Sequence, residues 1–546
     1  MKLTKKSFLL FALTLMLAFV LAACASEPDE TSGTSDDTET SSDADAAEDE
    51  TSEEASDGGD LVIANQSDAV SLDPAGSNDV PSSNVAENIY ETLVKQNMDM
   101  ELEPGLATDW EAVEDNVWEF TLREGVKFHD GSDFNAEVVK ANIERVLDEE
   151  IGSPRQFLYA MISDIEVVDD YTVRFTTEYP FAPLPAHLAH SGGAMVSLEL
   201  IEEDYAAMED GEEPGSVISE NPVGTGFFKF DEWVPGDYIR LVKNDDYWDE
   251  PAKLDSVTFK VVDEDQTRVA ELLTGESHII DPLSPSDVAQ IEGEDGVDPA
   301  RQASVSLSYI GFNAQKEPFD DPKVRQAINM AIDKEQIIEG IYDGAGIPAI
   351  GPLAPDVFGY DENVEGLEYN PEKAKELLAE AGYEDGFSTT IWTNDQRERI
   401  DAATNIQAQL EEFGIEVEVE ILEWGAYLEQ TANGEHDMFV LGWSTVTGDA
   451  DYGLYALFHS DNFGDPGNRT FTDDPELDDL LDQARQEPEP EKRQELYTEI
   501  QELLAENAPM LYIHHQELLL GVGDNVQGLE QLPTGVLQLK DVTLSE

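Results

Sequence analysis

Cysteine is almost absent from this chain of 546 residues, which contains only Cys24. One thiol cannot form an intrachain disulfide, and it cannot supply the set of thiolates that a structural zinc or iron–sulfur site needs. The folded part must therefore be stabilised by ordinary burial of apolar surface. Free cysteines are commonly buried in cores, but the position of Cys24 favours another interpretation, given below.

Positive charge is also scarce, because 30 Lys and Arg stand against 120 Asp and Glu, for a formal net charge of −90 at pH 7. Nucleic acids are bound by neutralising their phosphates with Lys and Arg, so we expect no nucleic-acid partner. Docking of the folded part on anionic lipid is disfavoured for the same reason. We interpret the acidic excess as adaptation to high salt, which screens the self-repulsion of a compact acidic body.

Long apolar runs are equally rare, and the chain has a single one at residues 8–23. It follows three lysines and ends in Leu-Ala-Ala before Cys24, which is the order of a secretory signal peptide. The last four residues resemble a bacterial lipobox, whose cysteine is lipidated and becomes the mature N-terminus. An uncleaved membrane helix is the alternative, but the run is shorter than the about 20 residues that cross hydrocarbon. We predict a signal peptide at 1–23 and a lipid anchor on Cys24, at the extracytoplasmic face of the cell membrane.

The next segment, residues 24–60, is a predicted tether. Residues 25–60 contain 15 Asp or Glu and no Lys, Arg or aromatic residue. Such a segment buries too little apolar surface to offset the entropy of ordering, and its like charges repel one another. We expect it to be disordered and to hold a folded body away from the membrane; an acidic interaction tail is the alternative.

Residues 61–546 read as a globular α/β body of two or three domains. Asp-Pro at 321–322 and Asn-Pro at 370–371 are typical helix starts, and residues 415–421 alternate apolar and acidic side chains as a strand does. Residues 476–507 read as two helices interrupted by prolines. Strands that alternate with helices of this length are typical of α/β domains.

No catalytic pattern is visible. The eight histidines form no HExxH motif, and no GxSxG motif is present. Acidic pairs occur throughout such a chain and discriminate nothing. We therefore predict a protein that is not an enzyme and has no metal or cofactor of its own.

Several motifs resemble one family. They are WEFTLREGVKFHDGSDFNA at 118–136, NPVGTGFFKF at 221–230, YIGFN at 309–313, DPKVRQA at 321–327, EWGAY at 423–427 and Gly-Trp at 442–443. Together these motifs closely resemble the peptide- and nickel-type solute-binding proteins of ABC importers, most of all the dipeptide- and glutathione-binding branch. Most of the motif residues suit turns and cores, so their value is diagnostic of fold.

The resemblance implies a two-lobed, periplasmic-binding-protein-like (Venus-flytrap) fold with an extra subdomain on lobe one. It also implies a monomer that captures a short peptide between the lobes and delivers it to ABC permease subunits in the membrane. The predicted boundaries are 61–95, 219–305 and 516–546 for lobe I, 96–218 for the extra subdomain and 306–515 for lobe II. The hinge strands are then expected near 305–313 and 512–516.

A buried peptide carboxylate needs a cation, which is a rare residue type here. The family's dipeptide binders place a carboxylate-binding arginine in the loop after the strand that ends near residue 392, which makes Arg397 the first choice and Arg399 the second. The bidentate guanidinium suits this task. A solvated loop arginine paired with Asp395 or Glu398 is the alternative, and Arg469 is a further candidate.

The expected anchor for the ligand's ammonium departs from the family pattern. Peptide binders carry an aspartate three residues after Gly-Trp, where this chain has Val446. Asp449 and Asp451 follow, and either they take over this role or they are ordinary turn residues. The change disfavours a plain dipeptide and suits a ligand such as glutathione, with its γ-linked glutamate and two carboxylates.

The remaining candidates for the cleft are two aromatic residues and three short polar residues. Trp424 and Trp443 are expected as aromatic walls, although core packing also suits Trp424. Asn313, Ser77 and Asn78 are expected to hydrogen-bond the ligand backbone.

Two other functions stay open at this stage. A nickel chelate is the main rival ligand; His187 and His190 lie three residues apart, but two histidines do not complete a metal site. A lipoprotein that senses its ligand for a signalling partner is the other alternative.

Overall fold

The computed structural model describes residues 58–464 and 467–545. The predicted signal peptide, Cys24 and most of the predicted tether lie outside these residues. Asp60, which we assigned to the tether, is already the first residue of strand β1 (Asp60–Asn65). Within the described residues, no helix has the length and apolar character needed to span a membrane.

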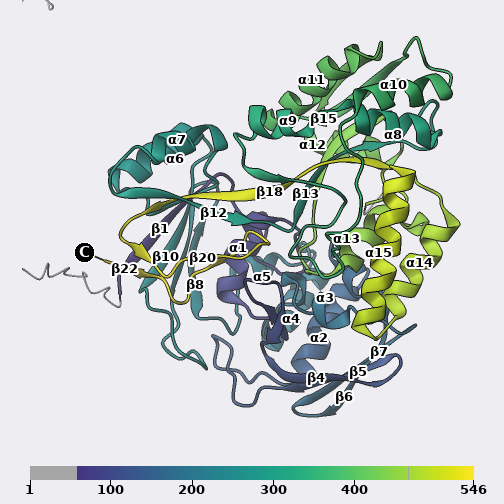
Figure 1. Cartoon of the computed structure of the whole chain (residues 1–546). Coiled ribbons are helices and arrows are strands. Elements are labelled where there is room, and N and C mark those ends of the chain that lie inside the picture. Colours follow the sequence, from purple (N-terminus) through teal and green to yellow (C-terminus); the bar gives the residue numbers. More distant parts are fainter. Residues whose placement is uncertain (1–57, 465–466, 546) are drawn as a thin grey trace, which may run out of the picture. The chain divides into compact units, whose positions relative to one another are not determined.

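Two groups of strands are joined through one long strand, β18 (Met510–Gly523) (Figure 1). The first group, which we call the first lobe, contains β1, β8 (Phe228–Val234), β9 (Tyr238–Lys243), β10 (Ser256–Val261), β11 (Ile279–Asp281) and β12 (Val297–Ala303). The second group, the second lobe, contains β13 (Ser306–Phe312), β14 (Gly346–Pro348), β15 (Ser388–Asn394), β16 (Glu416–Leu422) and β17 (Met438–Ser444).

Strand β18 belongs to both lobes. Its first half pairs with β13 and β14, as in Tyr309 opposite Tyr512, and its second half pairs with β11 and β12, as in Arg301 opposite Leu519. Strands β12 and β13 are separated by only two residues, so the chain passes between the lobes there as well. These crossings coincide with the two segments that the sequence predicts as the hinge.

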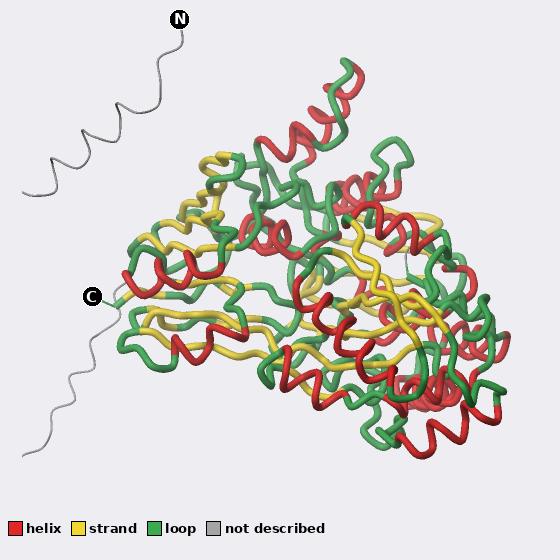
Figure 2. The backbone as a smooth tube through the Cα atoms, turned by 90° about the horizontal axis from the view of Figure 1, so that it is seen from above, coloured by secondary structure: helices red, strands yellow, loops and turns green. Residues whose placement is uncertain are grey.

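Helices pack around both groups of strands, and Figure 2 shows them on either side of the strands near the C-terminus. In the first lobe these are α1 (Val80–Ile89), α6 (Asp265–Thr274) and α7 (Val288–Ile291). In the second lobe they are α8 (Pro322–Ala331), α9 (Lys334–Ile341), α10 (Pro371–Glu380), α11 (Arg397–Glu411), α12 (Trp424–Ala432), α13 (Ala450–Phe458), α14 (Pro475–Gln486) and α15 (Pro490–Asn507).

Local sequence signals account for several of these elements. Asp321 and Asn370 cap helices α8 and α10 by accepting hydrogen bonds from backbone N–H groups, as the two Asp/Asn-Pro pairs predict. The predicted strand at 415–421 is β16, but only its first half keeps the expected alternation. Ile421 is exposed and Glu420 is half-buried, because β16 is the edge strand of the sheet and its end has no neighbour on one side.

The extra subdomain is built on a four-stranded antiparallel sheet. Its strands are β4 (Ala107–Glu114), β5 (Val117–Leu122), β6 (Ile162–Asp169) and β7 (Thr172–Thr177), and its helices are α2 (Ala136–Leu147), α3 (Leu184–His187), α4 (Leu198–Glu209) and α5 (Ser216–Glu220). Phe120 packs edge-on against Phe175 with ring centroids 5.5 Å apart. Gly125 and Gly131 have positive φ, which confirms the turns expected of this motif.

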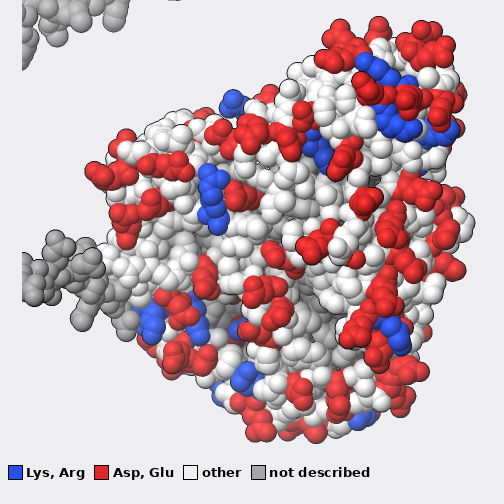
Figure 3. Space-filling model, viewed as in Figure 1, with Lys and Arg blue, Asp and Glu red and all other residues white. Residues whose placement is uncertain are grey.

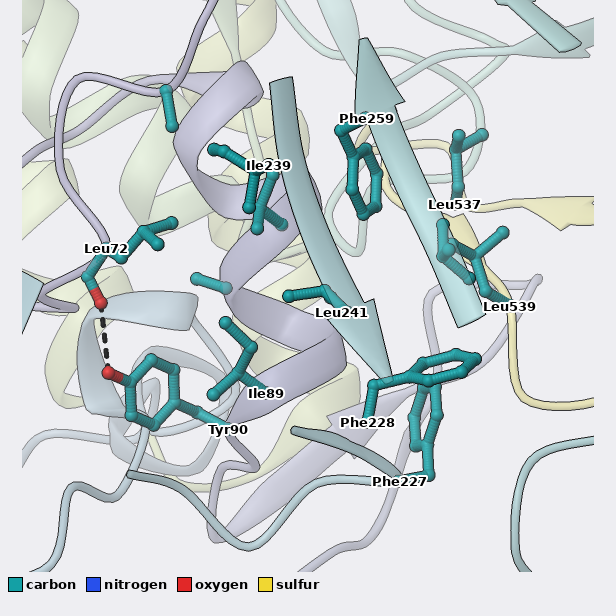
Figure 4. Close-up of a cluster of buried hydrophobic side chains, with 14 of the residues drawn as sticks. Leu72, Ile89, Tyr90, Phe227, Phe228, Ile239, Leu241, Phe259, Leu537 and Leu539 are labelled. Carbon is teal, nitrogen blue, oxygen red and sulfur yellow. Dashed lines mark hydrogen bonds between the residues drawn. The ribbon is translucent and has the colours of Figure 1, made fainter. Parts of the chain in front are cut away.

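Helix α1 is held by the apolar core of the first lobe (Figure 4). Val85 and Ile89 face this core, and the phenol of Tyr90 at the end of the helix donates a hydrogen bond to Leu72 O at 3.0 Å. Asp79 caps the first turn by accepting from Ser82 N. The core therefore fixes which face of α1 is turned away from the sheet.

Acidic side chains are spread over most of the face seen in Figure 3, and Lys and Arg form only small groups on it. This face therefore offers little positive surface to a polyanion.

Candidate ligand-binding site

A cavity of about 850 Å³ is lined by residues of the first lobe, the subdomain and the second lobe. The first lobe contributes α1 and the segment after it, the subdomain contributes residues 153–157 and 189–194, and the second lobe contributes the end of β17 and the start of α12. Cavities of this size hold ligands as large as a short peptide. Because three parts of the fold meet here, this cavity is the candidate site.

Aromatic side chains form part of its wall. Trp424 and Trp443 both line the cavity, as the sequence predicts. Trp424 is 42% exposed and stacks on Tyr427, whereas Trp443 packs against Tyr452 with ring centroids 5.3 Å apart. The buried indole N–H of Trp443 has no hydrogen-bond partner among the described residues, so it is a donor that a ligand carbonyl can use.

Neither arginine at the start of α11 lines the cavity itself, but Arg399 lies beside two residues that do, Trp424 and Gly442. Its guanidinium lies 5.6 Å from the ring centroid of Trp424, and a Cβ on cavity-lining Gly442 would be 3.6 Å from its Nη2. Arg399 donates to Asn394 Oδ1 at 3.2 Å. In the described part of the chain no carboxylate lies within 4 Å of Arg399, which leaves its charge available to a ligand.

Arg397, the first choice from the sequence, lies elsewhere. It is the first residue of α11 rather than part of a loop, its side chain is 84% exposed, and its Nε is 3.9 Å from Asp401 Oδ2. Two residues on a helix are about 200° apart, so Arg397 and Arg399 point to different sides. Arg397 is therefore solvated, as its alternative describes, but it lies on a helix and its nearest carboxylate partner is Asp401 rather than Asp395 or Glu398.

Arg469 lines the cavity and is almost completely buried. Its Nη1 donates to Leu428 O at 2.8 Å and to Thr431 Oγ1 at 3.3 Å, both on helix α12. These contacts hold the guanidinium beside the helix that carries Trp424. Arg399 and Arg469 thus place two guanidinium groups at or beside this wall of the cavity.

Asp449 and Asp451 do not line the cavity, and both carboxylates already have cationic partners. Asp449 accepts hydrogen bonds from both Nη atoms of Arg493, at 2.5 and 2.6 Å. Asp451 accepts from Arg485 Nε and Nη2, each at 3.1 Å. Although burial opposes it, Arg485 holds the pKa of Asp451 well below its ordinary value. The two aspartates thus serve buried ion pairs of the second lobe.

The other polar candidates are divided between the cavity and the scaffold. Asn78 lines the cavity, but Ser77 and Asn313 do not. The amide of Asn313 donates to Gly434 O and His436 O, at 3.0 and 3.1 Å, and so supports a turn of the second lobe. Its burial and these two bonds give it a structural role in this conformation.

One buried carboxylate, Glu91, accepts hydrogen bonds from several segments of the chain. Its donors are Lys95 Nζ, Thr225 Oγ1, Tyr247 OH and Trp248 Nε1, at 2.7–2.9 Å. Thr225 precedes β8, and Tyr247 and Trp248 follow β9. The network therefore joins the segment after α1 to the segments that flank β8 and β9.

Three further polar residues near α1 were missed by sequence reasoning. Glu87 lines the cavity, and burial raises its pKa to about 7, an effect that the charges of Arg155 and Lys95 oppose. Arg155 is 2% exposed and donates to Ser191 Oγ at 3.0 Å and Ser83 Oγ at 3.2 Å. Burial keeps the pKa of cavity-lining His190 well below its ordinary value, so this imidazole is neutral. Nothing in the local sequence distinguishes these residues from the many other charged ones.

The histidines considered for nickel lie apart from any donor set. Within residues 58–464 and 467–545, no three His, Cys, Asp or Glu side chains are arranged to hold a metal ion. The ring of His187 contacts Leu158 O, and Nδ1 of His190 accepts from Gly192 N.

Comparison with known proteins agrees with this architecture. A model of the bacterial extracellular solute-binding proteins, family 5, matches residues 101–465. The glutathione-binding protein GsiB of Escherichia coli O157:H7 is 34% identical over 495 residues, which cover 89% of this chain and 94% of that protein.

Solved structures extend the comparison. The ABC transporter-associated periplasmic binding protein DppA from Helicobacter pylori, in complex with the peptide STSA, has a TM-score of 0.78 at 34% identity and covers 90% of this chain and 98% of its own. The oligopeptide-binding protein AppA from Bacillus subtilis, in complex with a nonapeptide, has a TM-score of 0.77 at 28% identity and covers 90% and 100%. The matched chains are two-lobed binding proteins, which confirms the predicted fold class and the prediction that the protein is not an enzyme. The chain belongs to the family 5 bacterial extracellular solute-binding proteins.

Proposed function

We propose that this protein is the substrate-binding component of an ABC importer and that its ligand is a short peptide with two carboxylates, glutathione being the first candidate. The observation that carries this proposal is the position of Arg399 beside Trp424 and Gly442, which line the cavity. Arg399 has no carboxylate within 4 Å among the described residues although the chain has 120 acidic residues, and it lies against Trp424. A cation held in this way binds a ligand carboxylate without first breaking an ion pair.

Arg469 supports the same assignment from the neighbouring helix. Burial of an anionic ligand costs free energy unless cations meet it, and two guanidinium groups on one wall suit a ligand with more than one carboxylate. The indole N–H of Trp443 offers a further donor for a peptide carbonyl. The relatives, which include glutathione-, dipeptide- and oligopeptide-binding proteins, point to the same ligand class.

The cellular setting is part of the proposal. We place the protein outside the cytoplasm, as a monomer anchored by lipid on Cys24 and held by the acidic tether near its permease. The lobe boundaries proposed from the sequence are retained, with the first lobe beginning at Asp60. Cys24→Ala is expected to release the protein from the membrane fraction of its native host; continued membrane association would contradict the anchor.

Calorimetric titration of the purified body in high salt tests the ligand class. Glutathione is expected to bind with micromolar or tighter affinity, plain dipeptides more weakly, and a nickel–histidine chelate not at all. Tight binding of the chelate, with no measurable binding of any peptide, would contradict the proposal and favour a nickel chelate as the ligand. If the protein binds peptides but no permease gene lies beside its own gene, the ligand-sensing alternative would be favoured.

A further inference from the structure

Two charged side chains that do not touch lie beside the cavity, the anion Glu87 on α1 of the first lobe and the cation Arg155 in the subdomain. Glu87 and Ser83 are four residues apart on α1 and so share one face of the helix. Both line the cavity, and Arg155 donates to Ser83 Oγ at 3.2 Å. The guanidinium therefore lies beside the helix face that carries Glu87, yet no nitrogen of Arg155 comes within the 4 Å of an ion pair.

Three carboxylates line the cavity, and they differ in what they already bind. Asp79 caps α1 by accepting from Ser82 N, and Glu91 has four donors. The carboxylate of Glu87 accepts no hydrogen bond from any described residue. It also lies in the last turn of α1, where the helix dipole adds negative potential. A cation brought by a ligand would offset both effects.

Arg155 lacks the partner that a buried arginine ordinarily has. Its Nη1 and Nη2 donate only to hydroxyl oxygens among the described residues, Ser191 Oγ at 3.0 Å and Ser83 Oγ at 3.2 Å. Its Nε has no hydrogen-bond partner in the described residues. Ser83 and Ser191 themselves line the cavity, and their hydroxyl oxygens lie 3.2 Å apart. Ser83 Oγ donates its proton to Asp79 O at 2.9 Å, so Ser191 is the hydroxyl that can turn its proton to a ligand. A carboxylate bound at Ser191 would feel the charge of Arg155, which donates to the same hydroxyl oxygen.

We propose that Glu87 binds the ligand's ammonium group and that the hydroxyl of Ser191, backed by Arg155, binds a carboxylate on the adjoining carbon. This inference rests on the proposed function and narrows its ligand class. An ammonium and a carboxylate on the same carbon form an amino-acid head group, which survives in a γ-linked peptide. In an ordinary α-linked peptide that carboxylate is consumed by the first peptide bond.

The second lobe shows why the ammonium needs an anchor on α1. Val446, at the position where the family's peptide binders carry aspartate, lines the cavity as an apolar side chain. Asp449 and Asp451, the next carboxylates along the chain, are held by Arg493 and Arg485 outside it. Among the carboxylates that line the cavity, Glu87 is therefore the one that has no hydrogen-bond or ion-pair partner in the described part of the chain.

Titrations that remove one group from each partner test the assignment. Wild-type protein and Glu87→Gln are titrated with glutathione, with glutaryl-Cys-Gly, which lacks the ammonium, and with 4-aminobutanoyl-Cys-Gly, which lacks the adjoining carboxylate. Wild type is expected to bind glutathione at least about tenfold more tightly than either analogue, since a charge-assisted hydrogen bond is lost in each case. Glu87→Gln is expected to lose that tenfold for glutathione and nothing for glutaryl-Cys-Gly.

Glu111→Gln is the matched control, because it removes the same charge from an exposed position on β4 and is expected to bind all three ligands as wild type does. Equal losses for glutathione and glutaryl-Cys-Gly in Glu87→Gln, or no loss for either, would overturn the assignment while leaving the proposed function intact. Failure of wild type to bind any of the three would overturn the proposed ligand class, and the head-group assignment with it.

Discussion

His187 of the subdomain lies 3.6 Å from Asp451 of the second lobe, and both side chains are buried. Asp451 is also the partner of Arg485, whose guanidinium lies over the ring of Phe181 in the subdomain at 5.1 Å. The backbone N–H of Ala182 donates to Arg485 O at 3.0 Å. These contacts join the second lobe to the subdomain beside the cavity, so the carboxylates once considered for ligand binding instead help to hold the lobes in this arrangement.

Asp451→Asn is expected to destabilise the protein by about 3–5 kcal/mol, because it leaves the buried guanidinium of Arg485 without its counter-charge. Denaturant unfolding followed by fluorescence measures this change. Asp461→Asn, at a carboxylate whose side chain is 80% exposed, is the control and is expected to change stability by less than about 0.5 kcal/mol. If Asp451→Asn lowers the free energy of unfolding by as little as the control does, the ion pair contributes little to stability.

Arg399→Ala is expected to weaken glutathione binding about tenfold or more, because the ligand carboxylate loses its cation in a partly desolvated site. Arg397→Ala removes the same charge from the same helical turn at an exposed position and is expected to leave the affinity unchanged. Calorimetry on the two variants separates the candidates. The opposite ranking would return the role to Arg397.

Glutathione affinity is expected to fall as the pH is lowered from 8 to 5.5. Burial raises the pKa of Glu87 to about 7, so below this pH the free carboxyl is protonated and must lose its proton to bind an ammonium. The charged groups around it are Arg155, Lys95, Asp79 and Glu91, and neutral His190 lines the same cavity. Titrations in buffers of different ionisation enthalpy should show proton release near pH 6.5. The same slope in Glu87→Gln would assign the effect to another group.

The sign for stability is the reverse. Between the ordinary pKa of about 4.5 and the raised value, the folded protein binds more protons at Glu87 than the unfolded chain does. The contribution of Glu87 to the free energy of unfolding therefore decreases as the pH rises through this window. Glu87→Gln is expected to be more stable than wild type above pH 7, which also makes it a safe variant for binding studies.

Molar salt is expected to raise the melting temperature of the purified body by several degrees over dilute buffer. Most of the chain's formal net charge of −90 lies in this body and produces self-repulsion that salt screens, whereas the buried ion pairs are screened much less. Thermal unfolding at several salt concentrations measures this difference. The same melting temperature in dilute and molar salt would contradict the interpretation as a salt-adapted protein.

Much of the local structure follows from local sequence. Asp321 and Asn370 begin their helices where the Asp-Pro and Asn-Pro pairs predict, and a proline separates α14 from α15 as expected. Such signals act within one turn of backbone, so they survive without knowledge of the rest of the fold. The exposed Ile421 at the end of β16 departs from its pattern because its surroundings depend on strand order, which a seven-residue window does not contain.

The sequence by itself determined the family, the α/β two-lobed architecture and the absence of catalytic motifs, because the ordered motifs of a family are preserved along the chain. Only the tertiary structure decided which charges face the cavity. Arg399 rather than Arg397 lies beside the cavity-lining Trp424 because the two arginines lie on different sides of one helix. Asp449 and Asp451 are paired with arginines 44 and 34 positions away, and a hydrogen bond between Ser83 and Arg155, 72 positions apart, places Arg155 beside the helix that carries Glu87. Partners so distant in sequence meet only when the core has placed their elements, so the binding character of a charged residue is a property of the fold.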